Sequence, residues 1–267
     1  GRTGTKGDQA YLVSPEVAAA AALTGRITDP ATLGFAYPDV RDADKFLIDD
    51  SMMITPPCCG KGIEIIRKKT IGSPPVNQAL PDMINGTVVI KVGDKTSTDD
   101  IMPAGVHLKH RSNIPEYAKV VFERFNEEGK PTFAQRAMAV RDAGGHGIIV
   151  GRDSYGQGSS REHAAICPMY LGVKALIAMA IERIHAANLV NFGIVPFTFA
   201  DKADYDKIEQ GDSLVIEGLR DKLAKKEMPI TAVLTKKDGS KAEIKLNYHL
   251  SDEDIKIILA GGRLNVK

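Results

Sequence analysis

The sequence has little cysteine, almost no net charge and no long apolar run. Its three cysteines, Cys58, Cys59 and Cys167, show no repeated spacing, so we do not expect a disulfide framework. Cys58 and Cys59 are neighbours whose side chains cannot easily converge on one metal, and we interpret all three as reduced thiols. A formal net charge of +1 gives no global attraction for nucleic acid or an anionic membrane, so any anion binding has to be local.

Signals for membranes, export and nucleic acid are also missing. No apolar run approaches the ~20 residues that a membrane helix needs. The chain opens with GRTGTKGDQAYLV, which lacks an initiator methionine and the apolar centre of a signal peptide. We therefore read it as the interior of a longer protein and expect a cytoplasmic location. No basic stripe interleaved with aromatic residues suggests a nucleic-acid partner.

The first third of the chain has one strong signal and a long irregular stretch. The segment VSPEVAAAAALTG (13–25) predicts a short helix, because Ser14 can cap it, Pro15 suits its first position and Gly25 can end it. From about residue 26 to 86, proline and glycine punctuate the sequence, with one candidate strand at IEIIR (63–67). A loop this long is uncommon inside one compact domain, so we expect a connector and a domain boundary near residue 83.

Beyond that boundary, strand and helix patterns alternate. We expect strands at 86–93, 147–151, 173–180, 194–199 and 213–218, helices at 115–126, 132–145, 159–172, 181–193 and 251–262, and a hairpin over 230–249 that turns at Asp238–Gly239. The fold class is therefore α/β: a compact mixed-sheet domain, preceded by a short helical segment and a long linker.

The segment GRDSYGQGSSREHAAICPMY (151–170) has the strongest chemical character. It predicts a strand, a glycine-hinged turn and a helix whose exposed backbone N–H groups attract anions. Arg161 can offer a two-pronged contact to a carboxylate. With such donors nearby, a serine alkoxide could remove a proton from the carbon next to a bound carboxylate. The spacing leaves open a plainer alternative, a helix that Ser159 or Ser160 merely caps.

Several longer stretches carry a resemblance to a known family. GQGSSREHAA (156–165), followed by YLGVKALIAMAIERIHAANLVNFGIVPFTFAD (170–201), closely resembles the C-terminal swivel domain of aconitases. KVGDKTSTDDIMPAGVHLKHR (91–111) resembles the opening of that domain, and the first 25 residues look like the end of the aconitase core. The resemblance divides the chain into the tail of the core domain (1–60), a linker (61–83) and a swivel domain (84–267) like the fourth domain of aconitases.

This resemblance implies a hydro-lyase of the tricarboxylic acid cycle that interconverts citrate and isocitrate through cis-aconitate. By motif, Ser159 would be the base that takes the carbon-bound proton, and Ser160 and Arg161 would bind substrate carboxylate beside it. Arg111 would be a second carboxylate clamp. Asp99 would belong to the hydrogen-bonded shell of the site.

One further substrate residue, Arg2, matches an arginine that the preceding domain contributes. Several arginines around a tricarboxylate make physical sense, because each guanidinium neutralises and orients one arm. Plainer roles remain open: Arg111 as a solvated surface cation and Asp99 as a turn residue. We interpret His163 and His185 as mainly structural.

The sequence departs from the aconitase pattern in two respects. Aconitases commonly carry histidine where this chain has Asp100. Their [4Fe–4S] cluster is held by three cysteines that include a C-x-x-C pair, which this chain lacks. We therefore expect the cluster to be bound in the full-length enzyme by domains absent from this chain, and no metal to be held here.

The expected partners are a tricarboxylate substrate and the missing cluster-bearing core domains, with no membrane and no nucleic acid. Alone, the chain is expected to be inactive. The alternatives are a homoaconitase or isopropylmalate dehydratase, since GSSREHA also occurs in the small subunit of the latter, or an RNA-binding regulatory relative.

Overall fold

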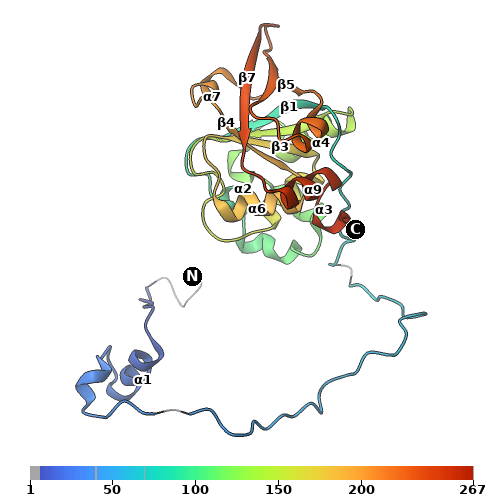
Figure 1. Ribbon diagram of the computed structural model, residues 1–267. Coiled ribbons are helices and arrows are strands. Elements are labelled where there is room, and N and C mark those ends of the chain that lie inside the picture. The colour runs from blue at the N-terminus through green and yellow to red at the C-terminus, as the bar shows by residue number, and fades with distance from the viewer. Residues whose placement is uncertain (1–6, 40, 69, 267) are drawn as a thin grey trace. The chain divides into compact units, whose positions relative to one another are not determined.

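A computed structural model describes residues 7–39, 41–68 and 70–266 of the chain. The chain forms two compact units, Gly1–Ile63 and Glu64–Lys267, which we describe separately (Figure 1). The first unit contains helix α1 (Pro15–Thr24) and the 3-10 helix η1 (Pro30–Leu33). Ser14 caps α1 by accepting from the amide of Val17, and Gly25 ends it in the left-handed conformation. The predicted short helix is therefore confirmed.

The second unit is a closed barrel of seven strands. The strands are β1 (Ile84–Lys91), β2 (His146–Val150), β3 (Val173–Ala178), β4 (Val195–Phe199), β5 (Ser213–Ile216), β6 (Ile230–Thr235) and β7 (Lys241–Tyr248). Their order around the barrel is β1-β2-β3-β4-β7-β6-β5. Strands β1 to β4 pair in parallel and the remaining pairs are antiparallel, including the predicted β6–β7 hairpin. The expected α/β fold with a mixed sheet is confirmed.

Short helices connect these strands. They are α2 (Thr98–Ile101), α3 (Ile114–Tyr117), α4 (Phe133–Asp142), α5 (His163–Tyr170), α6 (Arg183–Asn191), α7 (Asp204–Lys207), α8 (Leu219–Ala224) and α9 (Asp252–Ala260), with 3-10 helices η2 (Gly105–His110), η3 (Ala118–Val120), η4 (Glu123–Phe125) and η5 (Arg263–Asn265). No described helix is long and apolar enough to cross a membrane.

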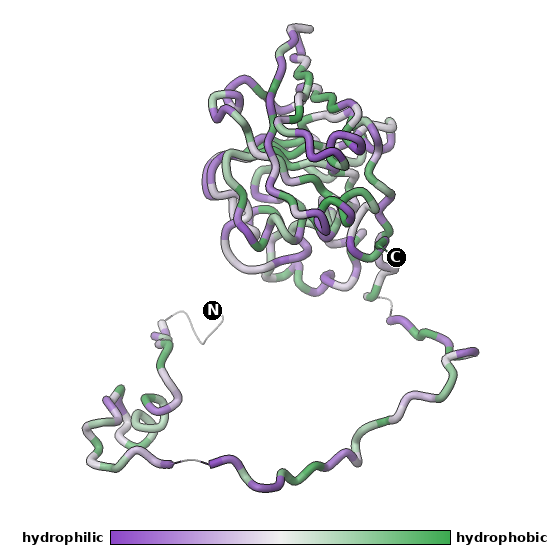
Figure 2. The backbone as a smooth tube through the Cα atoms, in the orientation of Figure 1, coloured by the Kyte–Doolittle hydropathy of each residue, from purple (hydrophilic) through white to green (hydrophobic). Residues whose placement is uncertain are grey.

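Two hydrophobic cores stabilise the barrel unit. Alternate residues of all seven strands, such as Ile148 and Phe197, form one core together with residues of α8 and α9. The other core lies between the outward face of the parallel strands and the helices, and Phe122 and Phe133 belong to it. The tube in Figure 2 shows the matching hydrophobic stretches through the middle of this unit. Strand β3 is buried along its whole length, and its sequence is apolar except for Lys174.

The helix expected over 115–126 and the strand expected over 63–67 are not formed as predicted. The helix expected over 115–126 is divided into α3, η3 and η4. Phe122 interrupts it, with φ 55°, because its ring is fully buried and its amide donates to the carbonyl oxygen of Ile101. Burial of this aromatic ring therefore overrides the local helical pattern. The residues of the candidate strand over 63–67 have no regular secondary structure.

Residues 71–81, which we call the strap, pack on the barrel unit. The amide of Gly72 donates to the carbonyl oxygen of Ser112, and the buried Leu80 accepts from Arg220 at 2.7 Å. Asn77 donates to the carbonyl oxygen of Phe192 at 3.0 Å. Much of the expected linker (61–83) therefore lies against the barrel, while the boundaries 1–60, 61–83 and 84–267 stay a prediction.

Candidate active site

The loop between β2 and α5, residues 151–162, carries the predicted serines, and we call it the serine loop. Backbone hydrogen bonds attach it to two other segments. The amide of Gly156 donates to the carbonyl oxygen of Thr96, and the amide of Thr98 donates to that of Gln157, each at 2.8 Å. On the other side, the amide of Tyr155 donates to Ala180 at 3.0 Å. The loop is thus fixed by main-chain contacts from both neighbours.

A buried histidine lies beneath this loop. His185 is 1% exposed, and its ring packs against that of Tyr155 with 5.4 Å between centroids. Gly156 has φ 83°, and a Cβ atom there would lie 2.4 Å from Cγ of His185. Only glycine fits at this position, because both its backbone conformation and the close approach exclude a side chain. Burial lowers the pKa of His185 to about 4, so the ring is neutral at pH 7.

Helix α5 begins later than the sequence predicts. Its first residue is His163 rather than Ser159, and its N-cap Glu162 makes no capping hydrogen bond with its side chain. Ahead of this start, the carbonyl oxygen of Ser159 accepts from the hydroxyl of Thr98 at 2.9 Å, a contact with a different segment of the chain. The alternative in which Ser159 or Ser160 caps the helix is therefore wrong.

This late start leaves hydrogen-bond donors open beside the serines. Within the described chain, the backbone N–H groups of residues 160–163 have no acceptor. Ser159 and Ser160 are both exposed, and the hydroxyl of Ser159 has no partner among the described residues. Unpaired amides at a helix start are suited to hold a carboxylate or to stabilise an oxyanion.

Arg161 and Asp99, both predicted site residues, form an ion pair. The Nη1 atom of Arg161 contacts Oδ1 of Asp99 and also donates to the carbonyl oxygen of Met102 at 3.0 Å. The side chain of Arg161 is 18% exposed and that of Asp99 is 61% exposed. No acceptor in the described chain contacts Nε or Nη2 of Arg161. One nitrogen therefore anchors the guanidinium, and its other edge is free for a carboxylate.

The backbone of Arg111 is hydrogen-bonded to helix α5. Nε2 of His163 donates to the carbonyl oxygen of Arg111 at 2.9 Å, and since a carbonyl only accepts, this nitrogen carries the hydrogen. The His163 ring also packs against Tyr117, with 5.2 Å between ring centroids. The Arg111 side chain is exposed. We expected a structural role for His163. In the structure its ring joins the backbone of Arg111 to the first turn of α5.

Asp100, where the sequence departs from the aconitase pattern, caps helix α2. It forms a capping box with Ser97 and an ion pair with Arg124. Burial alone would raise the pKa of Asp100, but hydrogen bonds from Ser97 and Arg124 outweigh it and lower that pKa. Its carboxylate is therefore engaged in holding the segment that carries Thr98 and Asp99.

The structure thus gathers five predicted residues in one region and adds two contacts that the sequence did not reveal. Ser159, Ser160, Arg161, Asp99 and Arg111 lie around the start of α5, whereas Arg2 lies outside the described residues. The contacts that sequence reasoning missed are those of Thr98 with Ser159 and of Arg124 with Asp100. The threonine is part of the STDD stretch, but only the fold shows which loop it meets.

The described residues do not fit an iron–sulfur cluster. They contain no group of three or more histidine, cysteine or acidic side chains that could hold a metal ion. Cys58 and Cys59 are exposed and consecutive, and Cys167 is buried in the second unit, where burial raises the pKa of its thiol. A protonated, apolar-packed thiol is a poor metal ligand.

Comparisons with known proteins identify the family to which the chain is similar. The model of the aconitase C-terminal domain matches residues 97–202. A probable mitochondrial aconitate hydratase of Dictyostelium discoideum is 31% identical over a match that covers 96% of this chain and 37% of that protein. The mitochondrial homocitrate dehydratase of Saccharomyces cerevisiae is 33% identical, over 67% of this chain and 25% of that protein.

A solved structure is also similar. The 3-isopropylmalate dehydratase (leuD) of Methanocaldococcus jannaschii is 26% identical over 69% of this chain and 92% of that one, with a TM-score of 0.48. The present chain spans only 37% and 25% of the length of the two curated relatives named above. From the family-model match and the match to the Dictyostelium protein, which covers 96% of this chain, the chain belongs to the aconitase family and corresponds to the C-terminal portion of its members.

Proposed function

We propose that this chain supplies the proton-abstracting serine and the carboxylate-binding arginines of a hydro-lyase that interconverts citrate and isocitrate through cis-aconitate. The observation that carries the proposal is the anchoring of Arg161. Asp99 and the carbonyl oxygen of Met102 hold its Nη1, so Nε and Nη2 are left to bind a substrate carboxylate two residues from Ser159. A pre-positioned guanidinium loses little freedom when the substrate binds.

Ser159 is proposed as the base. Its hydroxyl, which is exposed, must first lose its proton to water, and the open amides of 160–163 together with the Arg161 charge favour the alkoxide. The alkoxide then takes the proton from the carbon next to the bound carboxylate, and the electron pair of that C–H bond forms the double bond. Arg111, held through His163, binds a second carboxylate. Departure of hydroxide from the neighbouring carbon requires an electrophile from elsewhere, for which the family's cluster-bearing domains are the proposed source.

Exposed apolar side chains support a missing partner domain. Leu47, Ile54 and Ile66 are almost fully exposed, and the other large apolar residues between 46 and 66 are at least 57% exposed. Soluble proteins rarely leave so many of them in water, and a second surface normally covers them. We propose the core domains of the longer protein as that surface.

The proposal is tested with the chain joined to the cluster-bearing core of its own protein. Formation of cis-aconitate from isocitrate is followed by absorbance, with Ser159→Ala as the test variant and Ser240→Ala, at the exposed β6–β7 turn, as the matched control. Loss of the base should reduce kcat by about 100-fold or more, and the control should match the parent protein.

The substrate is tested in the same assay. Turnover of homocitrate or isopropylmalate in place of isocitrate would overturn the citrate assignment and favour the related dehydratases. Equal rates for Ser159→Ala and the parent protein would contradict the assignment of the base.

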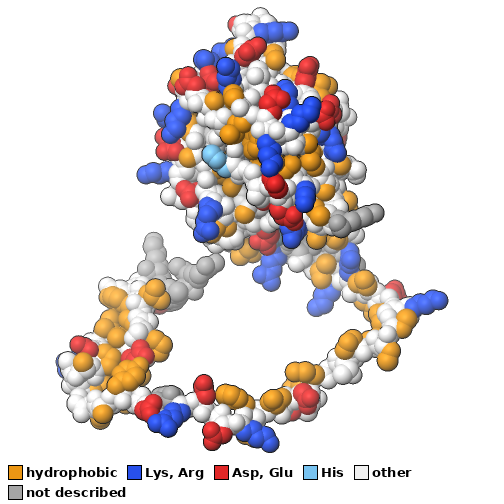
Figure 3. All heavy atoms as spheres, viewed as in Figure 1, with side chains coloured by type: hydrophobic (Ala, Val, Ile, Leu, Met, Phe, Trp, Pro, Cys, Tyr) orange, Lys and Arg blue, Asp and Glu red, His pale blue; other side chains and the backbone are white. Residues whose placement is uncertain are grey.

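Neither RNA binding nor location follows from the fold. Figure 3 shows Lys and Arg interspersed with Asp and Glu on the drawn face of the barrel unit, rather than a continuous basic surface. We therefore propose no RNA-binding role. Two relatives are named as mitochondrial, whereas we expected a cytoplasmic location from the sequence. Fractionation of cells that express the full protein would decide between the two compartments.

A further inference from the structure

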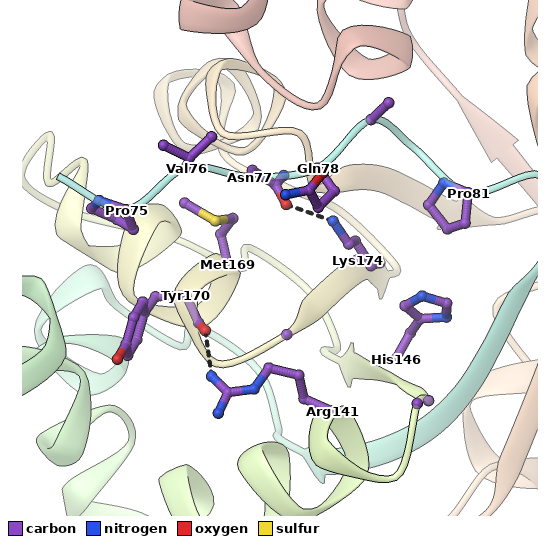
Figure 4. A pocket seen from close by; sticks show the side chains of 14 residues that line it. Pro75, Val76, Asn77, Gln78, Pro81, Arg141, His146, Met169, Tyr170 and Lys174 are labelled. Atoms are coloured by element: carbon purple, nitrogen blue, oxygen red, sulfur yellow. Dashed lines mark hydrogen bonds between the residues drawn. The ribbon is translucent and has the colours of Figure 1, made fainter.

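A cavity lies at the opposite end of strand β2 from the serine loop. Its volume is about 500 Å³, and the strap covers one side of it (Figure 4). His146, the first residue of β2, and Lys174, near the start of β3, line it together with Arg141 of α4. The serine loop follows the last residue of β2. The cavity is therefore separate from the candidate active site.

Lys174 is a buried cation without a carboxylate partner. It is 9% exposed, and its Nζ donates to Oδ1 of Asn77 in the strap at 2.5 Å. No acidic side chain in the described chain forms an ion pair with it, and burial lowers the pKa of its ammonium. Buried charges are normally paired, because leaving water costs free energy that a partner has to offset. Two of the three N–H donors of Lys174 thus remain available.

His146 adds a second uncompensated group. Its pKa is lowered by burial and by the nearby charge of Lys174. Its Nδ1 atom is buried and has no hydrogen-bond partner in the described chain. Figure 4 shows that His146 and Lys174 extend from neighbouring strands on the same side of the cavity. Together they form a site that an anion would complete.

Arg141 has a different role at the rim. Its Nη1 donates to the carbonyl oxygen of Tyr170 at 3.0 Å, and its Nε donates to Asp142 at 3.0 Å. The guanidinium therefore offsets the partial negative charge at the end of α5. Among the described residues that line the cavity there is no aspartate or glutamate, so the charge of Lys174 is not offset in this way.

The remaining wall is largely apolar. Pro75 and Val76 of the strap face Met169 and the region of Tyr170 at the end of α5. A cavity of this volume is in the range that holds small organic ligands. A ligand with one anionic group and an apolar body would match both parts of the wall.

We propose that this cavity binds a small organic anion, whose carboxylate or phosphate group lies at Lys174 and His146 and whose apolar body packs against the strap. The inference does not depend on the proposed hydro-lyase function. The bound anion takes the free donors of Lys174 and, with His146 protonated, a hydrogen bond from the imidazolium.

The site is tested by NMR on the ¹⁵N-labelled 267-residue chain. Hexanoate, acetate and inorganic phosphate are titrated separately while the amide signals of Gly145, His146 and Lys174 are followed. We expect saturable shifts at these residues, with hexanoate binding more tightly than acetate. A response to phosphate stronger than that to either carboxylate would assign a phosphate as the head group. Lys174→Met should weaken binding at least tenfold, whereas Lys225→Met, an exposed lysine after α8, should not change it.

A second measurement uses the unmodified chain, in case Lys174→Met does not fold. The ring of His146 is titrated by NMR with and without saturating hexanoate. The charged groups that face it across the cavity are Lys174 and Arg141, both cations. A bound anion should therefore raise the pKa of His146. Absence of saturable shifts for all three probes, an unchanged pKa, or full binding by a folded Lys174→Met chain would overturn the proposal.

Discussion

Nε2 of His163 donates to the carbonyl oxygen of Arg111 at 2.9 Å, although the two residues are 52 positions apart in the chain. This single bond joins the arginine that we propose as the second carboxylate clamp to the helix that follows the serine loop. We therefore propose His163 as a positioning residue that would act on the substrate through Arg111.

Replacing His163 tests this positioning. In the chain joined to its core, His163→Leu should raise KM for isocitrate about tenfold, in keeping with the loss of one hydrogen bond, and change kcat less. His163→Gln keeps a side-chain N–H donor and should restore most of the affinity. Steady-state kinetics of the three proteins decide the point. Equal KM values for Leu and Gln would show that packing against Tyr117, rather than the hydrogen bond, is what matters.

Arg161→Lys tests whether the guanidinium binds Asp99 and Met102 with one nitrogen and a substrate carboxylate with the other two. Lysine keeps the charge but has one nitrogen, which cannot hold Asp99 and the carbonyl of Met102 while also making a two-pronged contact to a carboxylate. We expect kcat/KM to fall by about 100-fold, which corresponds to ~2.7 kcal/mol. The free energy of unfolding should change by less than about 1 kcal/mol, because lysine keeps the charge and water screens the ion pair at the 61% exposed Asp99. Retention of kcat/KM within threefold would contradict a two-pronged role.

Gly156→Ala tests the close approach of the serine loop to His185. We expect a loss of about 3 kcal/mol in the free energy of unfolding, from a strained φ and an overlap with the ring. Gly158→Ala is the matched control: its φ is 101°, but the nearest atom to its Cβ is 3.7 Å away. It should lose only the backbone contribution, about 1 kcal/mol. Urea denaturation measures both, and equal losses would show that the His185 contact adds nothing.

The buried His185 should make stability depend on pH. Its pKa in the folded chain is about 4, below the ordinary 6.5, so the unfolded chain takes up the proton first as the pH falls. Stability is complete above pH 6.5 and is lost progressively between pH 6.5 and 4. Between pH 7 and 5 the loss is about 2 kcal/mol. In urea denaturation, the free energy of unfolding of a folded His185→Leu variant should fall by about 2 kcal/mol less than that of the parent protein between pH 7 and 5. Parallel pH profiles of the two proteins would refute this assignment.

Most strands and helices of the barrel unit could be predicted from the sequence, because buried strands appear as short apolar runs and helices begin at recognisable capping residues. The α4 capping box of Thr132 with Gln135 and the α9 capping box of Ser251 with Asp254 are examples. Closure of the sheet could not be predicted in this way, since β1 pairs with β5 across more than a hundred residues. The disruption of the helix at Phe122 depends equally on a distant partner, the carbonyl oxygen of Ile101.

The site was predicted as a set of residues but not as a set of contacts. The motifs placed Ser159, Arg161 and Asp99 together, yet they implied a helix that begins at the serines. In the structure the helix begins at His163, and the carbonyl oxygen of Ser159 accepts from the hydroxyl of Thr98, 61 residues away in sequence. The helix propensity of residues 159–172 contains no information about a contact with a distant segment such as that of Thr98. For the same reason the unpaired Lys174, within a strand that reads as wholly apolar apart from it, gave no signal before the fold was known.

Closure of the barrel also restricts how this unit can join other proteins. A closed sheet offers no unpaired strand to which a neighbouring chain could add. Any domain that docks here must do so through side chains and loops, so the two surfaces can separate and meet again without breaking a shared backbone ladder. Such an interface can be reversible. A substitution on the barrel surface can be compensated by one on the docked domain without changing the fold of either domain.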